Sequence, residues 1–190
     1  KPWPTDKHFD PDLLENGDRR NVLDKYRYWS VSAIVEDLDT KRHSLQIAIE
    51  NWQHDLNIGS VVRTANAFNV EKVHIVGKRD WNRRGAMVTD KYLHVLHHPT
   101  VQDFKKWCDE NSVPIIGIDN LPISKELESA KLPERSVLFF GQEGAGMSEE
   151  ATAICEVVLA IKQYGSTRSM NASAAGAIAM YHWALQHLPK

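Results

Sequence analysis

The chain has 190 residues, 42% of them hydrophobic and 25% charged, a balance that is typical of one globular domain and excludes a mainly disordered protein. Lys and Arg number 23 and Asp and Glu 25, so the net charge of −2 excludes a uniformly basic nucleic-acid coat and allows only a local basic surface. The two cysteines, Cys108 and Cys155, are too few for a disulfide framework and lack CxxC spacing, which favours a reducing compartment. No apolar run reaches the length of a membrane span and no signal-peptide core is evident, so we expect a cytoplasmic protein with no membrane anchor.

Residues 1–43 differ from the rest of the chain. They carry mixed charge and three prolines, and they show no strand pattern before a short helix around Ser32–Leu38. We interpret them as an N-terminal extension, followed by one α/β domain over residues 44–190.

From residue 44 onward, apolar runs alternate with helical periodicity, which predicts an α/β fold with a mostly parallel sheet flanked by helices. The runs expected to form buried strands are Leu45–Ile49, Val73–Val76, Ile115–Ile118, Val137–Phe140 and Val157–Ile161. Helices are expected from Asn57, which suits an N-cap, to Phe68, and then over Thr100–Asn111, Ser148–Cys155 and Ala172–His187. The last helix is rich in Ala and Gly, so another backbone can approach it closely.

A glycine-rich segment, Gly141-Gln142-Glu143-Gly144-Ala145-Gly146-Met147-Ser148, lies between a predicted strand and the helix that follows. A strand, a glycine loop and a helix N-terminus together present backbone N–H groups to a ligand at the carboxyl end of a sheet. The order GxxGxG differs from the dinucleotide fingerprint GxGxxG, and in the Walker-A spacing Met147 replaces the phosphate-binding lysine. A plain glycine turn is the alternative, although such a turn has no need of the carboxylate of Glu143.

Two further polar groups occur at predicted strand ends. Asn57, Ser60 and Arg63 open the first helix of the α/β domain, with Arg63 off its apolar stripe, and residues 165–171 separate the last strand from the last helix. Taken singly, Arg63 is typical of a solvated arginine, and the hydroxyl-rich residues are typical of a helix cap. Because the carboxyl ends of parallel strands meet at one edge of the sheet, we expect all three polar groups to lie together.

Three ordered motifs resemble those of the SpoU/TrmH family of RNA ribose 2′-O-methyltransferases. They are Asn57-x-Gly59-x-x-x-Arg63-Thr64-Ala65-x-Ala67-Phe68, Gly141-x-Glu143-Gly144-x-Gly146, and Ile161 with Ser169-Met170-Asn171-Ala172-Ser173. The resemblance covers about residues 44–188. It implies a SPOUT-type fold with a C-terminal deep trefoil knot, S-adenosylmethionine bound in the knot, and an obligate homodimer.

The resemblance also implies roles for individual positions. Those matching the family's cofactor contacts are Gly141, Gly146, Ile161, Met170 and the loop after Ile118. Those matching its catalytic group are Asn57, Arg63, Glu143, Ser169 and Asn171. The chain departs from the family at Ile161-Lys162-Gln163, where Ile-Pro-Met is usual, and at Met170, where leucine is usual.

Methyl transfer to a ribose hydroxyl requires in-line placement of two reactants and a partly deprotonated oxygen. Arg63 is expected to hold the substrate phosphate and favour the developing alkoxide. Since arginine keeps its proton in proteins, we expect Glu143 to hold Arg63 in place rather than Arg63 to act as a base. Ser169 and Asn171 can orient the ribose or the cofactor carboxylate through hydrogen bonds.

Residues 78–94 are the strongest candidate for RNA contact, with five basic and two acidic side chains. An exposed Trp81 beside Arg83 and Arg84 suits base stacking and phosphate attraction, and Arg168 adds a cation near the third motif. A solvated charged loop is the alternative. His94, His97 and His98 lack regular ligand spacing, so no metal is expected.

Two alternatives to an RNA methyltransferase stay open. A non-catalytic RNA-binding module could use the same fold, although the presence of Arg63, Glu143 and Asn171 argues against it. A different nucleotide-binding α/β enzyme is disfavoured by the missing lysine and the glycine order. The sequence leaves open whether the RNA is tRNA or rRNA.

Overall fold

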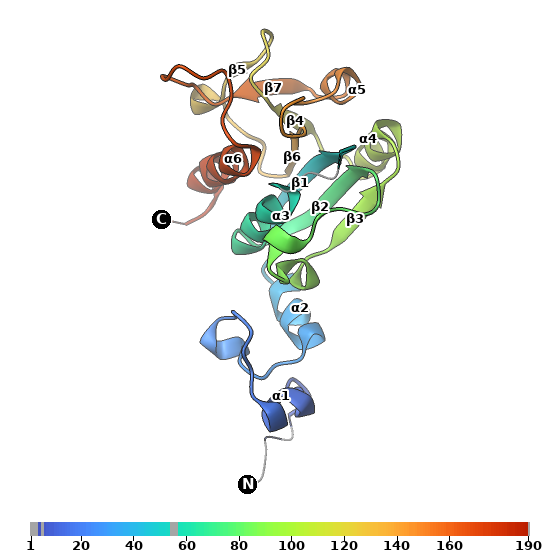
Figure 1. Ribbon diagram of the computed structural model, residues 1–190, viewed down its shortest axis with the longest axis vertical. Coiled ribbons are helices and arrows are strands. Elements are labelled where there is room, and N and C mark those ends of the chain that lie inside the picture. Colours follow the sequence, from blue (N-terminus) through green and yellow to red (C-terminus); the bar gives the residue numbers. More distant parts are fainter. Residues whose placement is uncertain (1–3, 5, 54–56, 190) are drawn as a thin grey trace. The chain divides into compact units, whose positions relative to one another are not determined.

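The computed structural model describes residues 4, 6–53 and 57–189, and the chain divides into two compact units, residues 1–42 and 43–190 (Figure 1). In the first unit, helix α1 (Pro11–Asn16) begins where the Asp10 side chain accepts hydrogen bonds from the N–H groups of Asp12 and Leu13. Helix α2 (Val31–Asp39) begins where Ser30 accepts from Ala33 N–H, and it confirms the predicted short helix. Helix α1 was not predicted, because its six residues are too few to show periodicity.

The second unit contains a seven-stranded sheet in which every pairing is parallel, in the order β3-β2-β1-β6-β4-β7-β5. The strands are β1 (His43–Asn51), β2 (Val70–Gly77), β3 (Val95–His98), β4 (Ile115–Ile118), β5 (Lys125–Glu126), β6 (Ser136–Phe140) and β7 (Val157–Ala160). All five predicted strands are confirmed. Strands β3 and β5 were not predicted, since β3 is mostly half-buried and β5 has only two residues, both exposed.

Helices cover both faces of the sheet (Figure 1). They are α3 (Asn57–Ala67), α4 (Val101–Glu110), α5 (Glu149–Ala153) and α6 (Ala172–His187). The predicted N-cap residue, Asn57, is the first described residue of α3, and the residues just before it lie outside the described part of the chain. Single turns of 3-10 helix occur at η1 (Asp24–Tyr26), η2 (Arg84–Ala86), η3 (Thr89–Tyr92) and η4 (Leu127–Ser129).

The core consists of two apolar layers, because neighbouring side chains along a strand point to opposite faces. On β6, Leu138 and Phe140 belong to the layer that includes residues of α3 and α6, whereas Val137 and Phe139 belong to the layer with α4 and α5. Gly176 of α6 faces α3, where a Cβ in its place would lie 3.4 Å from a methyl group of Val61. Gly176 therefore allows close packing of α6 against α3 within the chain.

The fold is that of the predicted class, a mostly parallel sheet flanked by helices. Strand order and register define pairing rather than threading, so the C-terminal trefoil knot stays a prediction. Within the described part of the chain, every helix is too short or too polar to cross a lipid bilayer.

Candidate functional site

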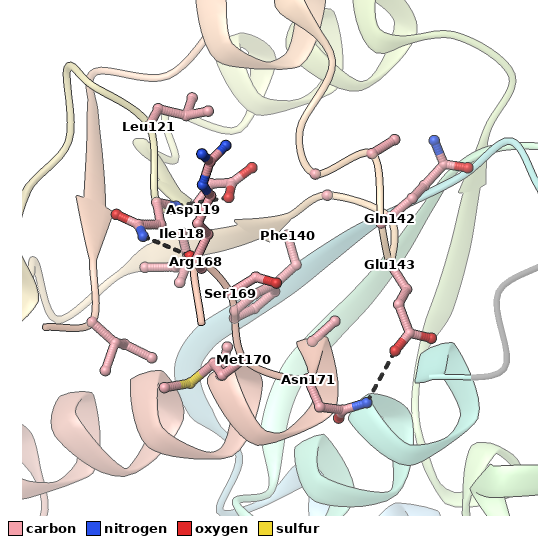
Figure 2. A pocket seen from close by; sticks show the side chains of 18 of the residues that line it. Ile118, Asp119, Leu121, Phe140, Gln142, Glu143, Arg168, Ser169, Met170 and Asn171 are labelled. Carbon is pink, nitrogen blue, oxygen red and sulfur yellow. Dashed lines mark hydrogen bonds between the residues drawn. The ribbon is translucent and has the colours of Figure 1, made fainter. Parts of the chain in front are cut away.

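The segments that follow β4, β6 and β7 enclose a cavity of about 590 Å³ at the carboxyl edge of the sheet (Figure 2). All five residues expected to contact a cofactor line it, namely Ile118, Gly141, Gly146, Ile161 and Met170. Four of the other predicted site residues line it as well, namely Glu143, Arg168, Ser169 and Asn171. The second and third of the three polar groups expected to meet at one edge of the sheet therefore do so.

The glycine loop after β6 is folded tightly onto itself. Gln142 and Gly146 exchange two backbone hydrogen bonds, at 3.1 and 2.9 Å, and Gly146 has a φ of +71° that other residues rarely adopt. A Cβ on Gly141 would lie 2.1 Å from the carbonyl carbon of Gly146. Gly141 is thus required by the backbone of the loop, before any ligand is considered.

Two carboxylates of the chain accept hydrogen bonds from the end of this loop. Asp119, which follows β4, accepts from Met147 N–H at 2.7 Å. Glu50, fully buried at the end of β1, accepts from Ser148 N–H at 2.8 Å and from the indole N–H of Trp52 at 2.8 Å. In a phosphate-binding loop the corresponding amides would face the phosphate, but here a phosphate would meet two negative charges. This arrangement excludes the Walker-type nucleotide site.

Three side chains from separate segments form a hydrogen-bonded cluster at the edge of the cavity, which we call the amide–carboxylate cluster: Asn57, Glu143 and Asn171. The Asn57 amide donates to Glu143 Oε2 at 2.5 Å. The Asn171 amide donates to Glu143 Oε1 at 3.3 Å (Figure 2) and to Asn57 Oδ1 at 2.9 Å. Asn171 Oδ1 accepts the N–H groups of Ser173 and Ala174, so this residue also caps α6. Each member is therefore held by at least two hydrogen bonds.

Arg63 lies apart from this cluster. It is exposed, and within the described residues its guanidinium makes neither a hydrogen bond nor an ion pair. The expectation that Glu143 holds Arg63 is wrong, because Glu143 bonds to the two asparagines instead. The cause is helical geometry: Arg63 is six positions after Asn57, a rotation of about 600°, which leaves their side chains about 120° apart around the helix axis.

Ser169 and Arg168 lie on the segment that connects β7 to α6. Ser169 is exposed and lines the cavity. The carbonyl of Arg168 accepts from the Asn120 amide at 2.9 Å, which ties this segment to the loop after β4 (Figure 2). This hydrogen bond joins the segments that follow β4 and β7, which are neighbouring strands, at the rim of the cavity.

Trp81 is buried, and the expectation that it is exposed is wrong. Only 6% of its surface is accessible, because it packs into the apolar layer that includes residues of α3. The Arg83 guanidinium lies 5.1 Å from the ring centroid and also pairs with Asp90 at 3.0 Å. Arg84 is exposed. A base therefore has no free Trp81 face on which to stack.

The histidines around β3 serve structure. His98 Nε2 lies 2.9 Å from His74 Nδ1, and His74 Nε2 donates to the Gln46 amide oxygen at 2.8 Å. Gln46 donates in turn to Glu71 at 3.0 Å. Burial lowers the pKa of His74 to about 3, so its ring is neutral. In the part of the chain that the structure describes, no three His, Cys, Asp or Glu side chains are grouped as metal ligands would be.

Two site residues were not identified from the sequence, Glu50 and Asp119. Each follows the apolar part of a strand predicted to be buried, and a carboxylate at that position is the signal that could have revealed them. The cysteines offer no nucleophile, because burial raises the pKa of both Cys108 and Cys155 to about 12.

Comparison with known proteins places this geometry in context. The model of the SpoU rRNA methylase family matches residues 44–181. A tRNA (guanosine(18)-2′-O)-methyltransferase from Borreliella burgdorferi is 25% identical over 177 residues, covering 91% of this chain and 80% of the relative. Among solved structures, the A. aeolicus TrmH/SpoU tRNA modifying enzyme superposes with a TM-score of 0.71 at 21% identity, covering 82% of this chain and 81% of that one. An AdoMet-bound rRNA methyltransferase from Sinorhizobium meliloti gives a TM-score of 0.70 at 21% identity, covering 82% of this chain and 61% of that one.

Proposed function

The chain belongs to the SpoU rRNA methylase family, and we propose that it transfers a methyl group from S-adenosylmethionine to a ribose 2′-hydroxyl of tRNA or rRNA. It is an S-adenosylmethionine-dependent RNA methyltransferase. The observation that carries the proposal is the convergence of all three family motifs on one edge of the sheet, where the second and third line a single cavity and the first supplies Asn57 to its edge.

The cavity suits the cofactor in size and lining. Its volume of about 590 Å³ falls within the roughly 300–1,000 Å³ of small-molecule sites. Ile118, Phe140 and Ile161 supply apolar wall, and backbone groups of the glycine loop border it. When bound, S-adenosylmethionine supplies an electrophilic methyl group. We assign cofactor contacts to Ile118, Gly141, Gly146, Ile161 and Met170.

We assign catalysis to the amide–carboxylate cluster together with Arg63 and Ser169. Glu143 fixes the amides of Asn57 and Asn171, so these two side chains are preorganised beside the cavity rather than free to rotate. Arg63, with no partner among the described residues, is available to hold the phosphate next to the target ribose. Arg83, Arg84 and Arg168 add positive charge for the RNA backbone.

We further propose that the enzyme works in the cytoplasm as a homodimer that meets through α6. This helix contains no Asp, Glu, Lys or Arg, yet Ile178, Tyr181 and Leu185 are 42%, 58% and 51% exposed. An uncharged apolar face of this kind is typical of contact with a second copy. Light scattering should give twice the mass of the chain, and a monodisperse active monomer would contradict the proposal.

Incubation with RNA and S-adenosylmethionine labelled in the methyl group tests the function. We expect label in acid-precipitable tRNA or rRNA. Binding of RNA without transfer of label to either substrate would favour the non-catalytic RNA-binding module instead.

A further inference from the structure

The segment between β2 and β3 presents a basic surface of exposed cations together with two exposed apolar side chains. Its exposed cations are Lys78, Arg79, Arg83, Arg84 and Lys91. Two acidic residues, Asp80 and Asp90, lie in the same segment, and Asp90 pairs with Arg83. The excess of positive charge therefore remains after this ion pair is counted.

Met87 and Val88 stand out within this surface. Their φ values are +48° and +70°, so two consecutive residues other than glycine occupy the left-handed region, and one of them is β-branched. Both are exposed, by 64% and 55%. The protein thus holds two apolar side chains in water in an unfavourable backbone conformation, and such strain is typically stored at functional sites.

The base of this segment is fixed directly to the helix that carries Arg63. A Cβ on Gly59 of α3 would lie 2.7 Å from the backbone nitrogen of Ala86, and a Cβ on Gly85 would lie 2.9 Å from that of Ser60. The two backbones are therefore in direct contact, and Ala86 is fully buried beneath them. The strained pair follows immediately after this contact, on a rigid support.

We propose that Met87 and Val88 form a preorganised apolar tip that packs against an unstacked base of the RNA substrate, while the surrounding cations hold its phosphates. RNA-binding surfaces combine these two chemistries, since single-stranded bases offer flat apolar faces beside charged backbone. A second copy of the chain fits less well, because it would bury five cations, in contrast to the uncharged face of α6. The inference rests on the proposed function. It assigns the apolar contact with RNA to Met87 and Val88 instead of Trp81.

The double variant Met87→Asn/Val88→Asn tests the tip. Asparagine tolerates the left-handed region, so we expect an unchanged or higher melting temperature. Affinity for labelled bulk tRNA and for rRNA fragments should fall roughly tenfold through lost apolar contact.

The slope of log affinity against log salt concentration should stay the same in the double variant, whereas Arg84→Gln should reduce its magnitude by about 0.7–0.9. If the two side chains had only a structural role, the double variant would weaken RNA binding only by lowering the melting temperature as well. Met87→Leu should keep the wild-type affinity.

Each other outcome is decisive. Wild-type affinity in the double variant would overturn the proposal, and so would a fall in mass by light scattering, which would assign the tip to a second copy. If the wild-type protein bound neither RNA, the proposed function would fail together with the inference. If it bound and methylated RNA and the double variant did so equally well, the inference alone would fail.

Discussion

Two networks of hydrogen-bonded polar side chains lie in the second unit, one in the segments at the carboxyl edge of the sheet and the other across strands β1, β2 and β3. The amide–carboxylate cluster of Asn57, Glu143 and Asn171 is half-buried to exposed and borders the 590 Å³ cavity. The second network, which we call the buried network, links His98, His74 and Gln46, and all three residues are buried. His74 and His98 lie against the rings of Phe104 and Trp107. Both networks are hydrogen-bonded, but only the first borders a cavity that a ligand can enter.

The difference separates function from stability. In the buried network the hydrogen bonds join the side chains to one another and to Glu71, so its loss should lower the free energy of unfolding and leave the rate of methyl transfer unchanged. In the open cluster the hydrogen bonds orient groups toward the cavity, so its loss should lower the rate of methyl transfer more than stability. Glu50 shares a feature with each network. It is buried, and it accepts a hydrogen bond from the end of the glycine loop that borders the cavity.

The largest effect on activity is expected for Arg63→Ala. The exposed side chain makes neither a hydrogen bond nor an ion pair within the described residues, so the melting temperature should change little and cofactor affinity should stay within a few fold. The rate of methyl transfer should fall by about 10²-fold or more, because phosphate positioning is lost. Calorimetry with S-adenosylmethionine beside the labelled-methyl assay separates the two quantities. Loss of cofactor binding or of folding would show that the assignment of Arg63 is wrong.

Asn171→Asp should also slow methyl transfer, by about 10-fold to 100-fold. Aspartate keeps the oxygen that caps α6, but it replaces the donating amide with a carboxylate that faces Glu143. Asn171→Ala is the matched control, since it removes the cap without adding charge and should cost about 1 kcal/mol of stability. Thermal melts and single-turnover rates distinguish them. Equal rates for the Asp variant and the wild type would remove Asn171 from the catalytic group.

Glu50→Gln should change both cofactor affinity and stability. A carboxamide oxygen can accept from Trp52 or from Ser148, but its NH₂ group then faces the remaining donor, at a cost of about 1–3 kcal/mol. The glycine loop should loosen, and affinity for S-adenosylmethionine should fall several-fold. Glu71→Gln provides the control, because Glu71 accepts from Gln46 near the opposite edge of the sheet. If both variants weakened cofactor binding equally, Glu50 would have no specific role in the loop.

Substitutions in the buried network should change the free energy of unfolding and not the rate of methyl transfer, and mainly at acidic pH. The pKa of His74 is lowered to about 3 by burial, whereas an unfolded histidine titrates near 6.5. Below pH 6.5 the unfolded state therefore binds a proton that the folded state does not, so stability should fall as pH decreases, by at most about 1.4 kcal/mol per pH unit. Melting temperatures from pH 8 to pH 5 should decline more steeply for the wild type than for His74→Asn, with methyl transfer at pH 7.5 retained. Parallel declines would contradict this account of His74.

The sequence predicted the parts of the site that depend on backbone and missed those that depend on distant partners. Val- and Ile-rich runs identified β1, β2, β4, β6 and β7, and the glycine loop followed from its position between a strand and a helix. Glu50 and Asp119 could not be assigned, because their acceptor roles depend on amides 98 and 28 residues away. The burial of Trp81 was concealed by its basic neighbours, since tertiary packing decided its position.

The nature of the methylated group tests the central claim most directly. RNA methylated with labelled S-adenosylmethionine should be hydrolysed by alkali, which requires a free 2′-hydroxyl to cleave each bond. If the cavity and the amide–carboxylate cluster serve ribose methylation, the label should appear in alkali-resistant dinucleotides. Label confined to mononucleotides would place the methyl group on a base and would contradict the account.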